Sequence, residues 1–443
     1  MKNFFIFCLT TILFASCNNS GERGRDQKTL SDTIVPTQGT GIVNPIINVY
    51  IENSGSMDGY VDGQTEFKGA IRDLLVMLKY HYDEKNIKIF FINSNVHSTA
   101  AEIDLATFAE NINTLWYIGD RKHSKLNNIF KQVLERTNDQ TISILFSDYI
   151  YSISGKNTAS LLNDEKSLTK DVFLSKWKND KVQLATAIVK MKSKFKGRYF
   201  PYTSDNDHFG IDMERPYYMC IIGKQEILND FNQKIELKTG KIEGYENKYV
   251  LSSKDPKGIY YTVLQSTYNI GRFKPLRKES SAEYTRGIEK VKLTRNGEKL
   301  SFAVVVDFSS LQVEDDYISN PANYTVTTDN FDIVDIFPIV MKDIRGNDLK
   351  KIQASNPTHI IILAAKTKSV SDVSFVMKKQ MPQWVYTSHT EDDTNPNPRT
   401  DKSPENLKEK TFGLKFWVEG ITEAYETIYP DNKNYFECTI SIK

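Results

Sequence analysis

Three oxygen-bearing side chains follow an apolar stretch near residue 50. Residues 46–51 (IINVYI) form a nearly continuous apolar run, which is typical of a strand covered on both faces. The run ends in Glu52, Ser54 and Ser56, which place one carboxylate and two hydroxyls at alternate positions. Hard oxygen ligands of this kind suit Mg²⁺. The alternative is that the serines, with Gly55 between them, only shape a turn and cap the next helix.

Two later segments offer further oxygen ligands. Residues 142–146 are predicted to be a strand, and Ser147 and Asp148 follow its end. Ser124 begins a stretch of helical periodicity over residues 124–136. In doubly wound sheets ligands bind outside the carboxyl ends of the strands, so we expect the three segments to meet at one edge. The predicted metal ligands are Glu52, Ser54, Ser56, Ser124 and Asp148.

The elements that must position these residues alternate between strand and helix. Strands are predicted at residues 46–51, 87–92, 142–146 and 217–223, and helices at 65–82, 124–136, 181–195 and 224–235. This alternation predicts an α/β fold with a doubly wound, mostly parallel sheet over residues 44–225. Residues 226–289 are a connecting region without an assignment.

The C-terminal part of the chain has a different pattern. Strands separated by turn-rich segments are predicted at residues 299–308, 324–336, 358–365, 370–378, 411–419 and 435–442. Their spacing predicts a C-terminal antiparallel β-sandwich domain over residues 290–443. Residues 389–410 are polar and rich in proline, which indicates a long exposed loop.

The order of the three oxygen-bearing motifs resembles the von Willebrand factor type A domain. That family has a strand ending in Asp-x-Ser-x-Ser, a later loop Thr and a later strand-end Asp, which together form a metal-ion-dependent adhesion site. Residues 52–57 (ENSGSM) are similar to the first motif, Ser124 to the loop Thr, and Asp148 to the second Asp. The resemblance covers residues 44–225. Two departures stand out, because Glu52 replaces Asp with a longer side chain and Ser124 lacks the Thr methyl group.

The N-terminus has the features of a bacterial lipoprotein signal. Lys2 precedes an apolar stretch at residues 4–14, which is too short to span a bilayer as a helix. Residues 14–17 (FASC) resemble a lipobox, so we expect a signal peptide at 1–16 and lipidation of Cys17. Polar, glycine-rich residues 17–43 are a predicted tether. The alternative is an ordinary secretory signal with an incidental cysteine.

The remaining composition limits the classes of partner. The chain has 57 basic and 56 acidic residues, so it has no electrostatic footprint for nucleic acid. Four cysteines are present. Cys220 and Cys438 are left after the signal and lipobox cysteines, and either a disulfide or two separate buried thiols is consistent with their strand-like surroundings, the second being favoured.

Together these features predict a Bacteroidetes-like lipoprotein anchored in the outer membrane, facing the periplasm or the cell exterior. The family resemblance implies a divalent cation, Mg²⁺ with Mn²⁺ or Ca²⁺ as alternatives, and a protein partner that offers a carboxylate. We expect adhesion or complex assembly and no catalysis. The alternatives are a structural or assembly lipoprotein that binds no metal, and an envelope hydrolase, for which no acid and base pair can be located.

Overall fold

The computed structural model describes residues 44–99, 104–105, 107–122, 124–153, 155, 157–202, 208–238, 240–394 and 405–443. The predicted signal peptide, the predicted lipidation site Cys17 and the predicted tether therefore lie outside the described residues. Among the residues that are described, no helix is long and apolar enough to cross a membrane.

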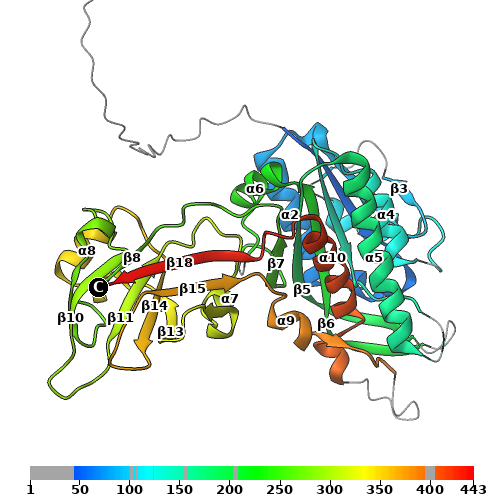
Figure 1. The fold of residues 1–443 in the computed structure, drawn as a ribbon. Coiled ribbons are helices and arrows are strands. Elements are labelled where there is room, and N and C mark those ends of the chain that lie inside the picture. Colours follow the sequence, from blue (N-terminus) through cyan, green and yellow to red (C-terminus); the bar gives the residue numbers. More distant parts are fainter. Residues whose placement is uncertain are drawn as a thin grey trace, which may run out of the picture. The chain divides into compact units, whose positions relative to one another are not determined.

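Seven strands form a central mixed sheet in the order β3-β2-β1-β4-β6-β5-β7 (Figure 1). They are β1 (Ile46–Glu52), β2 (Ile87–Ile92), β3 (Val96–Ser98), β4 (Thr141–Ser147), β5 (Leu184–Tyr199), β6 (Phe209–Lys224) and β7 (Tyr245–Leu251). Strand β1 pairs in parallel with β2 and with β4. The prediction of an α/β fold built on parallel strands is confirmed for this centre, and the outer strands are added antiparallel.

Helices cover both faces of this sheet. They are α1 (Asp58–Val61), α2 (Glu66–His81), α3 (Phe108–Leu115), α4 (Leu126–Glu135), α5 (Thr158–Asp180), α6 (Gln225–Lys234), α9 (Gln383–Thr387) and α10 (Leu414–Ile428). Val49 and Ile51 of β1 pack into the cluster that contains α2, α3 and α6, whereas Tyr50 packs into the one that contains α4, α5 and α10. This alternation of side chains explains why β1 is apolar throughout.

Two predicted elements are wrong. Residues 181–195 are not a helix, because Leu184–Tyr199 is the long strand β5. The sequence signal was the alternation of lysines at 190, 192, 194 and 196 with other residues, which has the period of a strand. Of residues 411–419 only Thr411–Phe412 is a strand, since helix α10 begins at Leu414 after Gly413 with φ 76°. A short apolar run does not distinguish a buried strand from a buried helix.

Strands β5 and β6 form a hairpin that is longer than its neighbour β4. Strand β4 pairs with β6 only from Ile142 to Ser147, opposite Gly223 to Tyr218. Residues 209–217 of β6 and their partners on β5 therefore extend past the carboxyl end of β4. We call this extension the hairpin arm. It packs on α1, where Gly59 and Gly197 let the two backbones approach closely, because a Cβ on Gly197 would lie 2.9 Å from the Cα of Gly59.

The C-terminal part of the chain forms a two-stranded sheet of β16 (His389–Thr390) and β17 (Thr411–Phe412) and two larger sheets. One has the order β12-β15-β18-β10-β9 and the other β13-β14-β11-β8. Their strands are β8 (Tyr261–Val263), β9 (Arg272–Pro275), β10 (Gly287–Lys292), β11 (Ser301–Val306), β12 (Tyr324–Val326), β13 (Phe331–Pro338), β14 (His359–Ala365), β15 (Val373–Lys378) and β18 (Asn434–Ile442). Buried side chains from both sheets meet in one hydrophobic cluster. The predicted strand at 324–336 is two strands, β12 and β13, which belong to different sheets.

The chain returns to the central sheet after β15. Helices α9 and α10 contribute Trp384 and Trp417 to the same cluster as Phe130 of α4 and Phe173 of α5. In Figure 1, α10 lies beside α5. Cys220 and Cys438 are free and buried, so they are two separate thiols and do not form a disulfide with each other.

Candidate metal-binding site

The carboxylate of Glu52 joins the three segments that carry the predicted ligands. One of its oxygens accepts a hydrogen bond from the Ser124 hydroxyl at 2.9 Å. The other accepts one from the hydroxyl of Ser147, at the end of β4, at 2.5 Å. Strand β1, the segment before α4 and the end of β4 therefore meet at one edge of the sheet, as the parallel arrangement predicts.

The remaining predicted ligands lie at the same edge. The Ser54 and Ser56 hydroxyl oxygens are 3.0 Å apart. Burial raises the pKa of Asp148, and a hydrogen bond from Ser56 opposes that rise; the Asp148 carboxylate also accepts a hydrogen bond from the amide of Ile150 at 3.2 Å. Glu52 and Asp148 each keep 4% of their surface exposed. The structure thus brings all five predicted side chains together in a largely buried group.

The loop after β1 is fixed by a side chain that sequence reasoning passed over. Asn53, inside the motif, is fully buried. Its amide donates to the carbonyls of Trp116 at 2.7 Å and Ile118 at 3.0 Å. The backbone amide of Gly55 donates to the Arg121 carbonyl at 3.1 Å. These bonds hold the Glu52 loop against the loop that leads to Ser124.

Burial and like charge disturb both carboxyl groups. Burial, followed by the nearby charge of Asp148, raises the pKa of Glu52 to about 7, against the opposing effect of three serine hydroxyls. Burial also raises the pKa of Asp148, against the Ile150 amide and the positive charge of Arg215. Two carboxylates that share a desolvated site cannot both ionise easily without a counter-charge.

A buried arginine and a third carboxylate border this pair, and neither was predicted from the sequence. Arg215 on the hairpin arm is 1% exposed, and its guanidinium lies 4.4 Å from the centre of the Tyr199 ring. Asp393, which is 0% exposed, accepts the Tyr199 hydroxyl at 2.7 Å. Burial raises the pKa of both Asp148 and Asp393, and the positive charge of Arg215 opposes this rise. The start of the expected exposed loop at 389–410 is therefore buried at Asp393.

Backbone strain marks the residue after Asp148. Tyr149 has φ 53°, in the left-handed region that bulky residues rarely adopt. Its amide donates to the Ser147 hydroxyl at 2.9 Å, and its ring lies 4.2 Å from that of Trp417. Such a conformation costs on the order of 1–3 kcal/mol and is concentrated at functional sites. It holds the end of β4 so that Ser147 reaches Glu52.

The donor chemistry and the charge of this group fit a divalent cation. The oxygen pairs Ser54–Ser56 and Glu52–Ser124 are 3.0 and 2.9 Å apart. Adjacent ligands of an octahedral Mg²⁺ with bonds of 2.0–2.1 Å are separated by about 2.9 Å. Within the described residues no group of three or more His, Cys, Asp or Glu side chains could hold a metal, so serine hydroxyls would have to take part.

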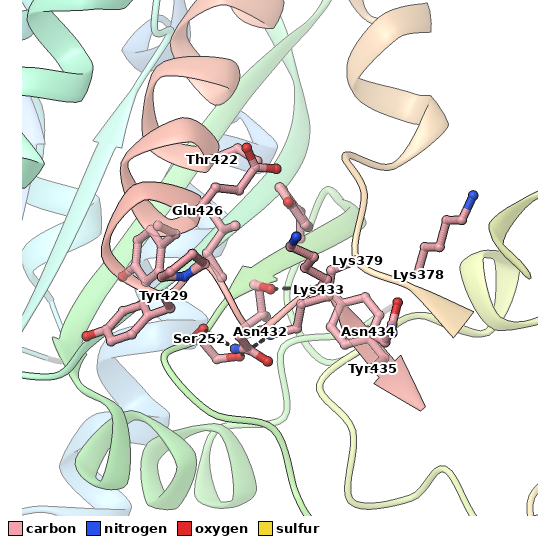
Figure 2. Close-up of a pocket in the computed structure, with 15 residues that line it drawn as sticks. Ser252, Lys378, Lys379, Thr422, Glu426, Tyr429, Asn432, Lys433, Asn434 and Tyr435 are labelled. Carbon is pink, nitrogen blue, oxygen red and sulfur yellow. Dashed lines mark hydrogen bonds between the residues drawn. The ribbon is translucent and has the colours of Figure 1, made fainter. Parts of the chain in front are cut away.

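A separate pocket of about 530 Å³ lies between the end of β7, the C-terminal half of α10 and the β15–β18 pair (Figure 2). Tyr249, Tyr425 and Tyr435 are part of its wall. The Lys379 ammonium group in this wall forms an ion pair with Asp255 at 2.5 Å. Burial lowers the pKa of Lys379 against the charge of Asp255. The pocket shares no residue with the acidic site and is a separate feature of the fold.

Comparison with known proteins found no similar protein. No family model matches the chain, and no curated protein or solved structure matches it. The chemistry of the acidic site therefore has to be inferred from its own residues.

Proposed function

We propose that this chain is an envelope lipoprotein with a von Willebrand factor A-like domain that binds a protein partner through a divalent cation. Glu52, Ser54, Ser56, Ser124 and Asp148 would hold the cation, which would be Mg²⁺ or, alternatively, Mn²⁺ or Ca²⁺. The ion would supply an open coordination position for a carboxylate of the partner. The two C-terminal sheets would form a β-sandwich that acts as a spacer or a second contact surface.

The observation that carries the proposal is the buried pair formed by Glu52 and Asp148. Asp393 lies close enough to share the same counter-charge, Arg215. If all are ionised, three carboxylates face one guanidinium, and a formal charge of −2 is left in a desolvated region. A divalent cation would neutralise that charge, which is a physical reason to hold the oxygens together.

Residues beside the site support a protein partner. Tyr117 is 76% exposed, and the Arg121 guanidinium stacks on its ring at 4.6 Å. Arg121 is only 17% exposed and is paired with Asp58, so Tyr117 is the exposed member, and tyrosine is among the side chains that contribute most to binding at protein interfaces. Both precede Ser124 in the same loop, so a partner that reaches the cation would also meet them.

The membrane part of the proposal depends on the N-terminal sequence. Lipidation of Cys17 would anchor the chain in the outer membrane, since each buried CH₂ of an acyl chain contributes about 0.8 kcal/mol. The tether at residues 17–43 would let the binding site reach away from the bilayer.

Thermal melting in Mg²⁺, Mn²⁺ and EDTA tests the metal directly. A cation that binds only the folded state raises the melting temperature. Glu52→Ala and Asp148→Ala should each remove this rise. The proposal fails if the wild-type melt is the same in Mg²⁺ and EDTA.

One observation favours a second candidate, a structural or assembly lipoprotein without a metal. Both oxygens of Glu52 already accept serine hydroxyls, and Arg215 partly balances Asp148. In that case the group would only lock three loops together. Glu52→Ala would then lower stability equally in EDTA and in Mg²⁺.

A further inference from the structure

Arg215 is in an unusual position for an arginine. It is buried to 1% exposure, and its Nε and Nη2 atoms have no hydrogen-bond partner among the described residues. Its guanidinium lies between aromatic rings, 4.4 Å from the centre of Tyr199 and 5.6 Å from that of Phe195. Arginine keeps its proton in proteins, so a permanent positive charge is buried there without full hydrogen bonding. Such a cost calls for a compensating charge nearby.

The compensating charges come from two distant parts of the chain. Asp148 follows β4, which neighbours β6, and Arg215 lies on β6 three residues beyond the last paired residue, Tyr218. On the other side, Asp393 binds the Tyr199 hydroxyl at 2.7 Å and the Tyr202 amide at 3.1 Å. The charge of Arg215 therefore acts on two carboxylates, that of Asp148 at the acidic site and that of Asp393, which belongs to a distant part of the chain.

We propose that Arg215 is the internal counter-ion of the acidic site and that Asp393 sets how strongly it opposes a cation. This inference rests on the proposed metal function. Arg215 stabilises Asp148 when no cation is present and repels a cation when one arrives. Asp393 draws part of the positive charge toward itself and so weakens that repulsion. When the segment around Asp393 is docked against Tyr199, cation binding at the acidic site is therefore favoured.

The two charges predict opposite effects on metal affinity. Arg215→Gln removes a positive charge beside the site, so Mn²⁺ should bind at least about tenfold more tightly. Asp393→Asn leaves Arg215 less balanced, so Mn²⁺ should bind at least about threefold more weakly. Arg215→Lys keeps the charge and should stay within about threefold of wild type. A purely structural role would move the first two variants in the same direction.

Titration calorimetry of the full-length protein with Mn²⁺ measures these affinities. Opposite shifts for Arg215→Gln and Asp393→Asn support the inference, and shifts of one sign, or unchanged affinities in a wild type that binds Mn²⁺, overturn it. If Arg215→Gln does not fold, Asp393→Asn decides, since an unchanged affinity there overturns the inference.

Melting in EDTA separates this inference from the metal function. Without metal, Arg215→Gln leaves Asp148 uncompensated and should lower the melting temperature, and adding Asp148→Asn should restore at least about half of the loss. No restoration overturns the counter-ion role even if wild type binds Mn²⁺. Restoration in a protein that binds neither Mn²⁺ nor Mg²⁺ supports the counter-ion role and overturns the metal function.

Discussion

Two buried carboxylates in this molecule have opposite surroundings. Asp348, at 2% exposure, accepts the backbone amides of Gln265 and Ser266, each at 2.8 Å. It also accepts the hydroxyls of Ser266 at 2.8 Å and Thr267 at 3.2 Å. Glu52, at 4% exposure, accepts two hydroxyls and faces a second carboxylate. Neutral donors around a buried charge anchor a loop, whereas two carboxylates placed together leave charge for a ligand to neutralise.

The largest expected effect comes from removing the carboxylate of Asp348, which anchors the loop at residues 265–267. Asp348→Ala leaves four donors without an acceptor and should lower the free energy of unfolding by roughly 4 kcal/mol. Urea denaturation measures the loss, and Asp348→Asn, which keeps one acceptor oxygen, should lose less. The loss should be equal in Mg²⁺ and EDTA. A metal-dependent difference would contradict the distinction between the two sites.

The next effect is a pH dependence that belongs to Glu52. Its pKa is about 7 in the folded protein against an ordinary 4.5, so the folded state holds a proton that the unfolded state has released. Stability from this group is fully present below pH 4.5 and is lost as pH rises through about 7. In EDTA the loss should be on the order of 3 kcal/mol. Urea denaturation at several pH values measures the free energy of unfolding of wild type and of Glu52→Gln, and the difference between the two isolates the contribution of Glu52. If this difference shows wild type gaining stability as the pH rises, the raised pKa of Glu52 is contradicted.

Removal of Mg²⁺ should distinguish most clearly the metal-site carboxylate of Asp148 from the loop-anchoring carboxylate of Asp348. At a Mg²⁺ concentration 100 times Kd, wild type should gain about 2.7 kcal/mol over EDTA. Asp148→Asn should lose this gain, while Asp348→Asn should keep it. Melting of the three proteins in parallel checks the result. Equal gains in all three would place the cation elsewhere.

The smallest expected effect concerns Ser124. Ser124→Ala removes a hydroxyl that contacts Glu52 at 2.9 Å and should weaken Mn²⁺ binding by about tenfold. Ser124→Thr keeps the hydroxyl and should bind nearly as wild type. Calorimetric titration compares the two, and equal weakening would mean that shape, not the oxygen, matters at this position.

The sequence was most informative where local pattern and topology agree. The apolar run of β1, the amphipathic helix α2 and the strand ends are short-range signals, so the parallel centre and the meeting of Glu52, Ser124 and Asp148 could be predicted. The antiparallel hairpin arm was not predicted, because Leu184, Ile188 and Met191 of β5 also have the spacing of one helix face over a short window, although its lysines alternate as in a strand.

The charges that balance the acidic site could not be predicted from the sequence. Arg215 and Asp393 are 178 positions apart, and their meeting depends on the pairing of β5 with β6 and on the return of the chain after β15. Asp393 lies in a polar segment whose composition indicates exposure, and tertiary contact with Tyr199 overrides that local signal. Long-range contacts of this kind leave no periodicity to detect.

Crystals grown with Mn²⁺ give the most direct test of the central claim. The account predicts one anomalous peak within about 2.3 Å of oxygens from the proposed ligand set of Glu52, Ser54, Ser56, Ser124 and Asp148. At saturating Mn²⁺ and neutral pH, an ordered site without such a peak would contradict it, and so would a peak bound only by residues elsewhere.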